Sequence, residues 1–270
     1  MKSFDKRLEK ILEKKSKASL WILTLGKFQV HRSGDPIPAK EWGRDKTLQL
    51  FQYLVTARKR NGLHKEQIIT RIWEEAGQKD GDRDFKVALH GMVKTLEPNR
   101  KSRTEAKYIT RQGLTYQLAM DEIWLDVEVL DELVTLANDA LHEDDKTAKK
   151  AYKAALEIYN GIYLPNRIYN DWTSAERERI QILAITAHIT LAELLLETKP
   201  MESIRLAQEA LQTDPTWEDA YRIQMLGYLN SGNRPQALKT YKKCKTVLEK
   251  EFGIEPLPET KALLEKIESL

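Results

Sequence analysis

The sequence is poor in the features on which secreted, membrane-spanning and disulfide-bonded proteins depend. One cysteine, Cys244, occurs in 270 residues, so no internal disulfide can form, and a cytoplasmic location is expected. No apolar run approaches the roughly 18 residues that a membrane-spanning helix needs, so no membrane partner is expected. Residues 1–17 are charged throughout and lack the apolar core of a signal peptide.

Catalytic and metal-binding motifs are also absent. The sequence has no HExxH, CxxC, GxSxG or glycine-rich phosphate loop. Four histidines on predicted helices have no partner at metal-ligand spacing, namely His64, His90, His142 and His188. Cys244 lies between two lysines and is expected to be an unreactive residue on a solvated helix. We therefore expect no catalytic residue, no metal site and no cofactor, and an enzyme is not predicted.

Charge is distributed unevenly along the chain, although the net charge is only +3. Residues 1–120 contain 26 Lys and Arg against 14 Asp and Glu, whereas residues 121–270 contain 18 against 27. Net charges of +12 and −9 indicate that the first part faces a polyanion and that the second part has a different function. The segment 1–17 alone supplies +4 of the twelve.

The most informative stretch, Asp82–Leu118, predicts a helix followed by a β-hairpin. The helix, Asp82–Leu96, has an apolar face in which Phe85, Ala88, Leu89, Met92 and Leu96 recur at three- and four-residue steps. Its outer face carries Arg83, Lys86, His90 and Lys94. A basic loop with Lys101, Arg103 and Lys107 then leads into strands at 108–110 and 115–118.

A helix with a cationic outer face beside an arginine-tipped hairpin is the geometry that a winged helix presents to double-stranded DNA. The helix enters the major groove while the hairpin contacts phosphates or the minor groove. The candidate DNA-binding residues are Arg83, Lys86, His90, Lys94, Lys101, Arg103, Lys107, Arg111 and Gln112. Lysine and arginine also cover helices that only face solvent, so this segment alone leaves both interpretations open.

The chain before this stretch predicts strands and then helices. The expected elements are strands within Leu20–His31 and at Ile37–Pro38, a helix from about Arg44 stopped by Asn61-Gly62, a helix over Lys65–Trp73 and a polar turn over Gly77–Gly81. Residues 1–17 predict an amphipathic helix. This helix could pack on the protein, bind a partner or serve as a connector.

After Leu118 the hydrophobic period is helical throughout. Asp126 is suited to cap the first helix, and Thr173 with Glu176 forms a capping-box pattern at a later one. The further helices are expected at Thr147–Tyr159, Thr173–Glu197, Ser203–Gln212, Trp217–Asn230, Pro235–Phe252 and from Pro258. Small and aromatic residues alternate over Ala207–Tyr241 as in tetratricopeptide helices, which predicts a stack of about three helix pairs.

Several segments resemble the Streptomyces antibiotic regulatory protein group and its relatives. The winged-helix part of the resemblance is carried by Leu25–Val30, Leu63–Trp73, Val87–His90 and Leu96–Pro98. The part similar to a bacterial transcriptional activation domain is carried by Trp124–Val127, Tyr163–Pro165, Trp172, Glu176–Glu178 and a closing pattern from Gly232 to Glu259 that includes Glu251–Pro256. The resemblance covers roughly residues 20–268. It implies a DNA-binding transcriptional regulator.

The recognition helix departs from this family at two positions. Gly91 and Val93 stand where relatives usually carry basic residues, and base readout depends on side chains such as arginine. Lys86, Lys94 and Arg111 remain, and they suit phosphate contact better than base readout.

The expected fold is mainly α with a small β component. It comprises a charged connector at 1–19, a winged helix-turn-helix at 20–120 and a tetratricopeptide-like helical-repeat domain at 121–270. The favoured hypothesis is a transcriptional regulator, more readily an activator, whose helical domain contacts RNA polymerase or a regulatory protein. The fold class is also compatible with a homodimer on repeated half-sites. The alternative is a helical-repeat interaction scaffold whose winged helix has lost sequence-specific DNA binding.

Overall fold

Two small β-sheets and the helices packed on them form one of the two units into which the chain divides. The computed structural model describes residues 2–75, 77–101 and 103–269. The winged-helix unit consists of Glu9–Val129 and Asn160–Glu178, and the helical unit consists of Met1–Leu8, Leu130–Tyr159 and Arg179–Leu270. Division by contacts therefore differs from division by chain order, because residues 160–178 belong with the winged helix. The mainly helical fold class predicted from the sequence is confirmed.

The winged-helix unit contains the predicted strands at shifted bounds and two strands that the sequence did not predict, β4 and β7, of which β7 contradicts the expectation that the chain is helical throughout after Leu118. The strands are β1 (Leu20–Leu23), β2 (Gln29–Arg32), β3 (Asp35–Pro36), β4 (Leu63–His64), β5 (Ile109–Gln112), β6 (Thr115–Leu118) and β7 (Ile123–Leu125). One sheet has the order β3-β2-β1-β7, with β7 parallel to β1, and the other has the order β4-β6-β5. The edge strand lies at Asp35–Pro36, two residues before the predicted position.

The helices of this unit pack an aromatic core against the hairpin. They are α2 (Lys14–Lys17), η1 (Ala39–Trp42), α3 (Asp45–Thr56), α4 (Lys65–Ile72), α5 (Gln78–Leu96), η2 (Met120–Glu122), η3 (Pro165–Arg167) and η4 (Asp171–Thr173). Phe85 of α5 lies edge-on to Tyr116 of β6, with ring centroids 5.2 Å apart, and Trp42 stacks on Phe51 at 5.1 Å. Phe85, Met92 and Leu96 are almost fully buried, as the helical period predicts.

Two predicted helix bounds are wrong. The predicted turn over Gly77–Gly81 is the first turn of α5, which begins at Gln78 instead of Asp82. A Cβ added at Gly81 would lie 2.6 Å from Cγ2 of Ile69, so this glycine lets α5 pack closely on α4. The helix predicted to end at Asn61-Gly62 ends at Thr56.

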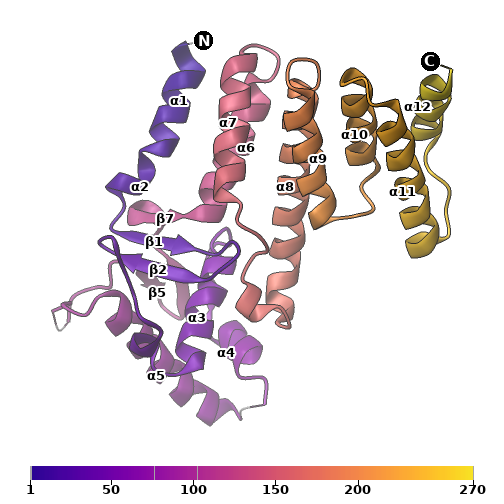
Figure 1. Ribbon diagram of the computed structural model, residues 1–270. Helices are drawn as coiled ribbons and strands as arrows, with labels where there is room; N and C mark the ends of the chain where they lie inside the picture. Colours follow the sequence, from indigo (N-terminus) through magenta and orange to yellow (C-terminus); the bar gives the residue numbers. More distant parts are fainter. Residues whose placement is uncertain (1, 76, 102, 270) are drawn as a thin grey trace. The chain divides into compact units, whose positions relative to one another are not determined.

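The helical unit is a succession of antiparallel helices, drawn from pink to yellow in Figure 1. Its helices are α7 (Asp145–Ile158), α9 (Pro200–Thr213), α10 (Glu218–Asn230), α11 (Arg234–Phe252), α12 (Pro258–Glu268) and most of α6 (Asp126–Ala140) and α8 (Ser174–Leu195). α10 packs against both α9 and α11, and Met225, Ala237, Tyr241 and Ile267 form a buried cluster. At Gly227 a Cβ would lie 2.6 Å from Cγ1 of Ile204, so small residues set the helix spacing.

The N-terminal helix α1 (Lys2–Leu12) packs on the protein at its first turns, which settles one of the three options left by the sequence. Leu8 is buried, Arg7 pairs with Asp139 at 2.9 Å, and Asp5 accepts a hydrogen bond from Thr147. Cys244 is fully buried instead of solvated, and burial raises the pKa of its thiol to about 12. Within the described ranges, no helix is both long and apolar enough to cross a membrane.

Candidate nucleic-acid interface

A buried carboxylate at the start of α6 holds the first strand of the winged-helix unit in place. Asp126 accepts hydrogen bonds from the backbone N–H of Thr24 at 2.5 Å, from the Thr24 hydroxyl at 2.6 Å and from the N–H of Leu25 at 2.9 Å. It also accepts one from the N–H of Val127, the next residue, but Asp126 is the first residue of α6, so this is not the N-cap bond predicted for it. Burial raises the pKa of this carboxyl, and the hydrogen bonds act in the opposite direction.

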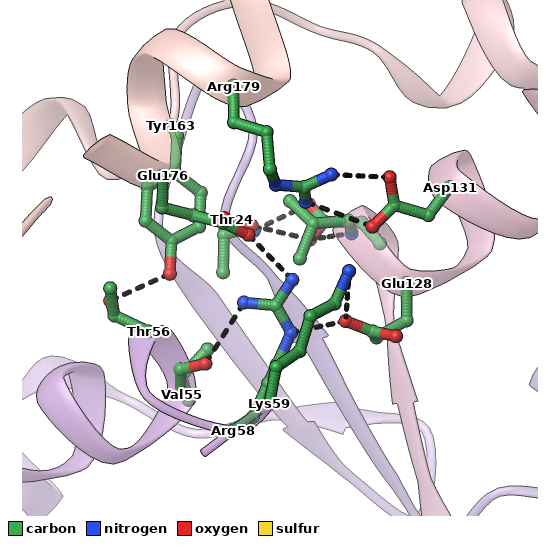
Figure 2. Close-up of polar contacts among 12 residues, drawn as sticks. Thr24, Val55, Thr56, Arg58, Lys59, Glu128, Asp131, Tyr163, Glu176 and Arg179 are labelled. Carbon is green, nitrogen blue, oxygen red and sulfur yellow. Dashed lines mark hydrogen bonds and ion pairs between the residues drawn. The ribbon is translucent and has the colours of Figure 1, made fainter. Parts of the chain in front are cut away.

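A buried arginine ties α3 to two distant segments, as Figure 2 shows. The side chain of Arg58 is 2% exposed, with its Nε 2.5 Å from Glu128 and its Nη2 2.7 Å from Glu176. Burial acts to lower the pKa of Arg58, but the two carboxylates raise it above the usual value. Nearby, the Tyr163 and Thr56 hydroxyls lie 2.8 Å apart. Both anchors fall outside the stretch that suggested the site.

The segment Asn160–Glu178 packs along α3 and the end of β1. The N–H of Leu164 donates to the carbonyl of Thr24 at 2.8 Å, and the N–H of Gly26 donates to that of Ile162 at 3.0 Å. Gly26 has φ +71°, and a Cβ there would collide with the backbone of Asn160 at 2.0 Å. This close approach requires glycine. The segment therefore supports α3 from a part of the chain that lies far from it in sequence.

A groove of about 920 Å³ opens between α5 and the hairpin β5–β6. Basic and polar residues in its wall come from three elements and the loop after α5, namely Lys65, Lys86, His90, Arg100, Arg111 and Gln112. Among the described residues that line it, the only carboxylate is that of Glu105. Leu89 and Val93 supply an apolar part of the same wall. The groove thus combines cationic walls with apolar surface beside a helix face.

Four of the nine predicted residues lie on this groove. Lys86 and His90 are exposed on α5, and neither side chain makes a hydrogen bond or ion pair to any residue that the structure describes. Arg111 is held on the wing, because its Nε donates to the carbonyl of Gly113 at 2.8 Å and its guanidinium lies 5.6 Å from the Tyr116 ring. Gln112 is exposed beside it. These side chains are available to a ligand that approaches the groove.

The other five predicted residues lie elsewhere. Arg83 pairs with Asp80 at 3.0 Å and with Asp84, and Lys107 pairs with Glu122, which raises the pKa of the lysine. Lys101 and Arg103 are exposed in the loop between α5 and β5, outside the groove wall. Lys94 lines a separate hollow on the other side of α5. The cations therefore do not form one continuous surface.

Sequence reasoning missed Lys65 and Arg100. Lys65 begins α4 and lies in the groove wall, where its Nζ is 2.9 Å from the Asp82 carboxylate. Arg100 follows α5 and donates to the carbonyl of Thr104. The basic loop was visible in the sequence, but the placement of the α4 N-terminus against the hairpin arises from the pairing of β4 with β6.

Comparison with solved structures gives a match titled "Mycobacterium tuberculosis EmbR in complex with low affinity phosphopeptide". The TM-score is 0.79 at 21% sequence identity, and the match covers 93% of this chain and 65% of that chain. The two chains therefore share a fold, and this chain matches only 65% of the length of the EmbR chain. No curated protein matches the sequence.

A family model described as the bacterial transcriptional activator domain matches residues 125–268, which is more than half of the chain. The match includes the whole C-terminal series of helices from α7 to α12. Together, the domain match and the structural match confirm the resemblance to the Streptomyces antibiotic regulatory protein group. The chain belongs to the bacterial transcriptional activator domain family.

Proposed function

We propose that the chain is a DNA-binding transcriptional regulator that places α5 in the major groove and the β5–β6 hairpin against the phosphate backbone. The single observation that carries this proposal is the groove, in which Lys86, His90 and Arg111 line the space between a helix and a hairpin. Phosphate contacts by lysine and arginine position a protein on a duplex. Membership of a transcriptional activator family supports the same function.

The helical unit is proposed to contact RNA polymerase or a regulatory protein. Support comes from the family description, because the bacterial transcriptional activator domain model matches residues 125–268.

The alternative, an interaction scaffold without sequence-specific DNA binding, is favoured by the apolar wall of the groove. Leu89 and Val93 contribute no hydrogen bonds to base edges. On this view the groove binds DNA only through its charge, or binds a protein segment.

The test is DNA binding at increasing salt, with genomic fragments and unlabelled competitor. A regulator retains particular fragments near physiological salt, and the slope of log affinity against log salt falls by about 0.9 for each phosphate contact removed. We expect this loss for Lys86→Gln and for Arg111→Gln. Lys239→Gln is the matched control, because Lys239 is an exposed lysine on α11. Release of all fragments at the same salt concentration would favour the scaffold, and no DNA binding at low salt would reject the proposal.

A further inference from the structure

A second hollow, of about 390 Å³, lies on the side of α5 away from the hairpin. Its wall includes Trp42, Arg44, Thr47, Gly91 and Lys94. Arg44 precedes α3, and Lys94 lies in the last turns of α5, so the two cations come from different elements. Both are exposed, and neither side chain makes a hydrogen bond or ion pair with another residue in the described ranges.

Gly91 keeps this hollow open. A Cβ added at Gly91 would lie 3.4 Å from both Cγ2 and Oγ1 of Thr47, so even a methyl group would touch the wall. A longer side chain would enter the hollow. Gly91 stands where relatives usually carry a basic residue in the recognition helix. Because it has no side chain, it also leaves the beginning of α3 accessible through the hollow.

The beginning of α3 offers hydrogen-bond donors to an anion. The twelve-residue helix has Arg44 as its N-cap, with no side-chain capping hydrogen bond. The N–H of Thr47 donates to the carbonyl of Arg44 at 2.9 Å, and the N–H groups of Asp45 and Lys46 have no described acceptor. Thr47, in that first turn, is only 5% exposed and lines the hollow. Its hydroxyl makes no hydrogen bond within the part of the chain that the structure describes. Because the Thr47 side chain is largely buried, lines the hollow and has no described hydrogen-bond partner, its hydroxyl can donate to an anion bound in the hollow.

The nearby carboxylates are already paired with arginines. Glu41 lines the hollow, and its Oε2 lies 3.4 Å from Nη1 of Arg32. Asp45, at the first position of α3, is bound by Arg167 at 2.9 and 2.5 Å, and this hydrogen bonding lowers its pKa. Arg44 and Lys94 therefore face the hollow as cations that no described carboxylate binds directly.

We propose that this hollow binds a backbone phosphate of the DNA that α5 contacts, through Thr47, Arg44, Lys94 and the N-terminus of α3. The inference rests on the proposed DNA binding and adds a second anchoring point to it. Phosphates border both sides of the DNA major groove, and α5 has cations on both sides, Lys86 toward the hairpin and Lys94 toward α3. The site fixes the position of the helix and does not read sequence.

The experiment measures the salt dependence of DNA binding by the full chain. Thr47→Val removes the hydroxyl at nearly unchanged volume, Thr47→Ser keeps it, and Lys94→Gln removes the charge. We expect Lys94→Gln to lower the slope by about 0.9, and Thr47→Val to weaken binding equally for every fragment. Thr47→Ser and the control Lys239→Gln should bind like the unmodified chain. Circular dichroism establishes that each variant is folded.

Duplexes carrying single neutral methylphosphonate linkages identify the phosphate. One position should weaken binding by the unmodified chain, and the same position should cause no further loss with Thr47→Val. If Lys86→Gln lowers the slope while Lys94→Gln and Thr47→Val do not, the inference is rejected and the DNA-binding function stands. If the unmodified chain binds no DNA, both are rejected.

Discussion

In the winged-helix unit the Arg58 guanidinium is 2% exposed between two carboxylates, whereas in the helical unit Arg205 pairs with Glu209 on an α9 surface where its side chain is 59% exposed. The first arrangement joins residues 70 and 118 positions apart, and the second joins residues one helical turn apart. At the closest helix contacts of the helical unit, the approach depends on small residues such as Gly227.

The difference follows from the two architectures. Short strands and short helices leave many backbone groups and connections to be fixed, and buried polar contacts such as those of Asp126 fix them with defined geometry. Antiparallel helix pairs satisfy their own backbone, so apolar packing between neighbours is sufficient. We therefore expect the two units to respond differently to the loss of charge and to the addition of volume.

The largest effect is expected for Arg58→Ala. Its removal leaves Glu128 and Glu176 without the guanidinium that they share, and breaking a buried ion pair costs about 3–5 kcal/mol of the free energy of unfolding. Urea denaturation measures the loss. Amide hydrogen exchange should locate it in β1 and α3.

The matched change in the helical unit is Arg205→Ala. An exposed i,i+4 pair contributes only about 0.3–0.5 kcal/mol. Equal losses for the two variants would contradict the proposed difference between the units.

An effect smaller than that of Arg58→Ala is expected when volume is added at a helix contact. In Gly227→Ala the new Cβ meets Ile204 at 2.6 Å, and overpacking of this kind costs about 1–3 kcal/mol. Thermal or urea unfolding measures the loss. Gly91→Ala is the control, because its Cβ makes only an ordinary 3.4 Å contact, and we expect a gain of up to about 1 kcal/mol from helix propensity. A stabilised Gly227→Ala variant would show that α9 and α10 are not closely packed at this point.

The smallest effect concerns His188 in α8. Burial lowers the pKa of this imidazole below 6.5, although the carbonyl of Ala184 and the charge of Glu209 act to raise it. Below pH 6.5 the unfolded chain therefore binds a proton at this position more readily than the folded chain does, so the free energy of unfolding falls on acidification. In His188→Gln the dependence of unfolding on pH just below 6.5 should be weaker than in the unmodified chain. An unchanged dependence would assign it to other groups.

Periodicity was sufficient to predict the face that α5 buries. Phe85, Met92 and Leu96 are inward and Lys86 and His90 are outward, because a helix repeats every 3.6 residues whatever surrounds it. The start of the same helix was not predictable from local preference, because Gly77–Gly81 favours a turn until Ile69 packs against Gly81. Similarly, Thr173 and Glu176 suggest a capping box, yet the Thr173 hydroxyl donates to backbone carbonyls and Glu176 binds Arg58.

The candidate site was only partly predictable for a related reason. Lys86 and Lys94 share the outer surface of α5, but they are eight residues apart and therefore turned about 80° from each other. Their neighbours decide which side each serves: the hairpin forms the wall beside Lys86, and the beginning of α3 forms the wall beside Lys94. Lys65 joins the first group through the β4–β6 pairing. Such walls come from tertiary contacts that no local pattern contains.

The shared guanidinium of Arg58 also has a consequence for biosynthesis. Its partner Glu176 lies 118 positions later in the chain, so at about 5–20 residues per second the ribosome delivers it roughly 6–24 s after Arg58. During that interval the nascent winged helix lacks the segment that contains Tyr163 and Glu176. A gene fragment that ends at residue 120 makes this state permanent, because it also omits Asp126 and Glu128. A fragment intended to fold on its own therefore has to extend through residue 178.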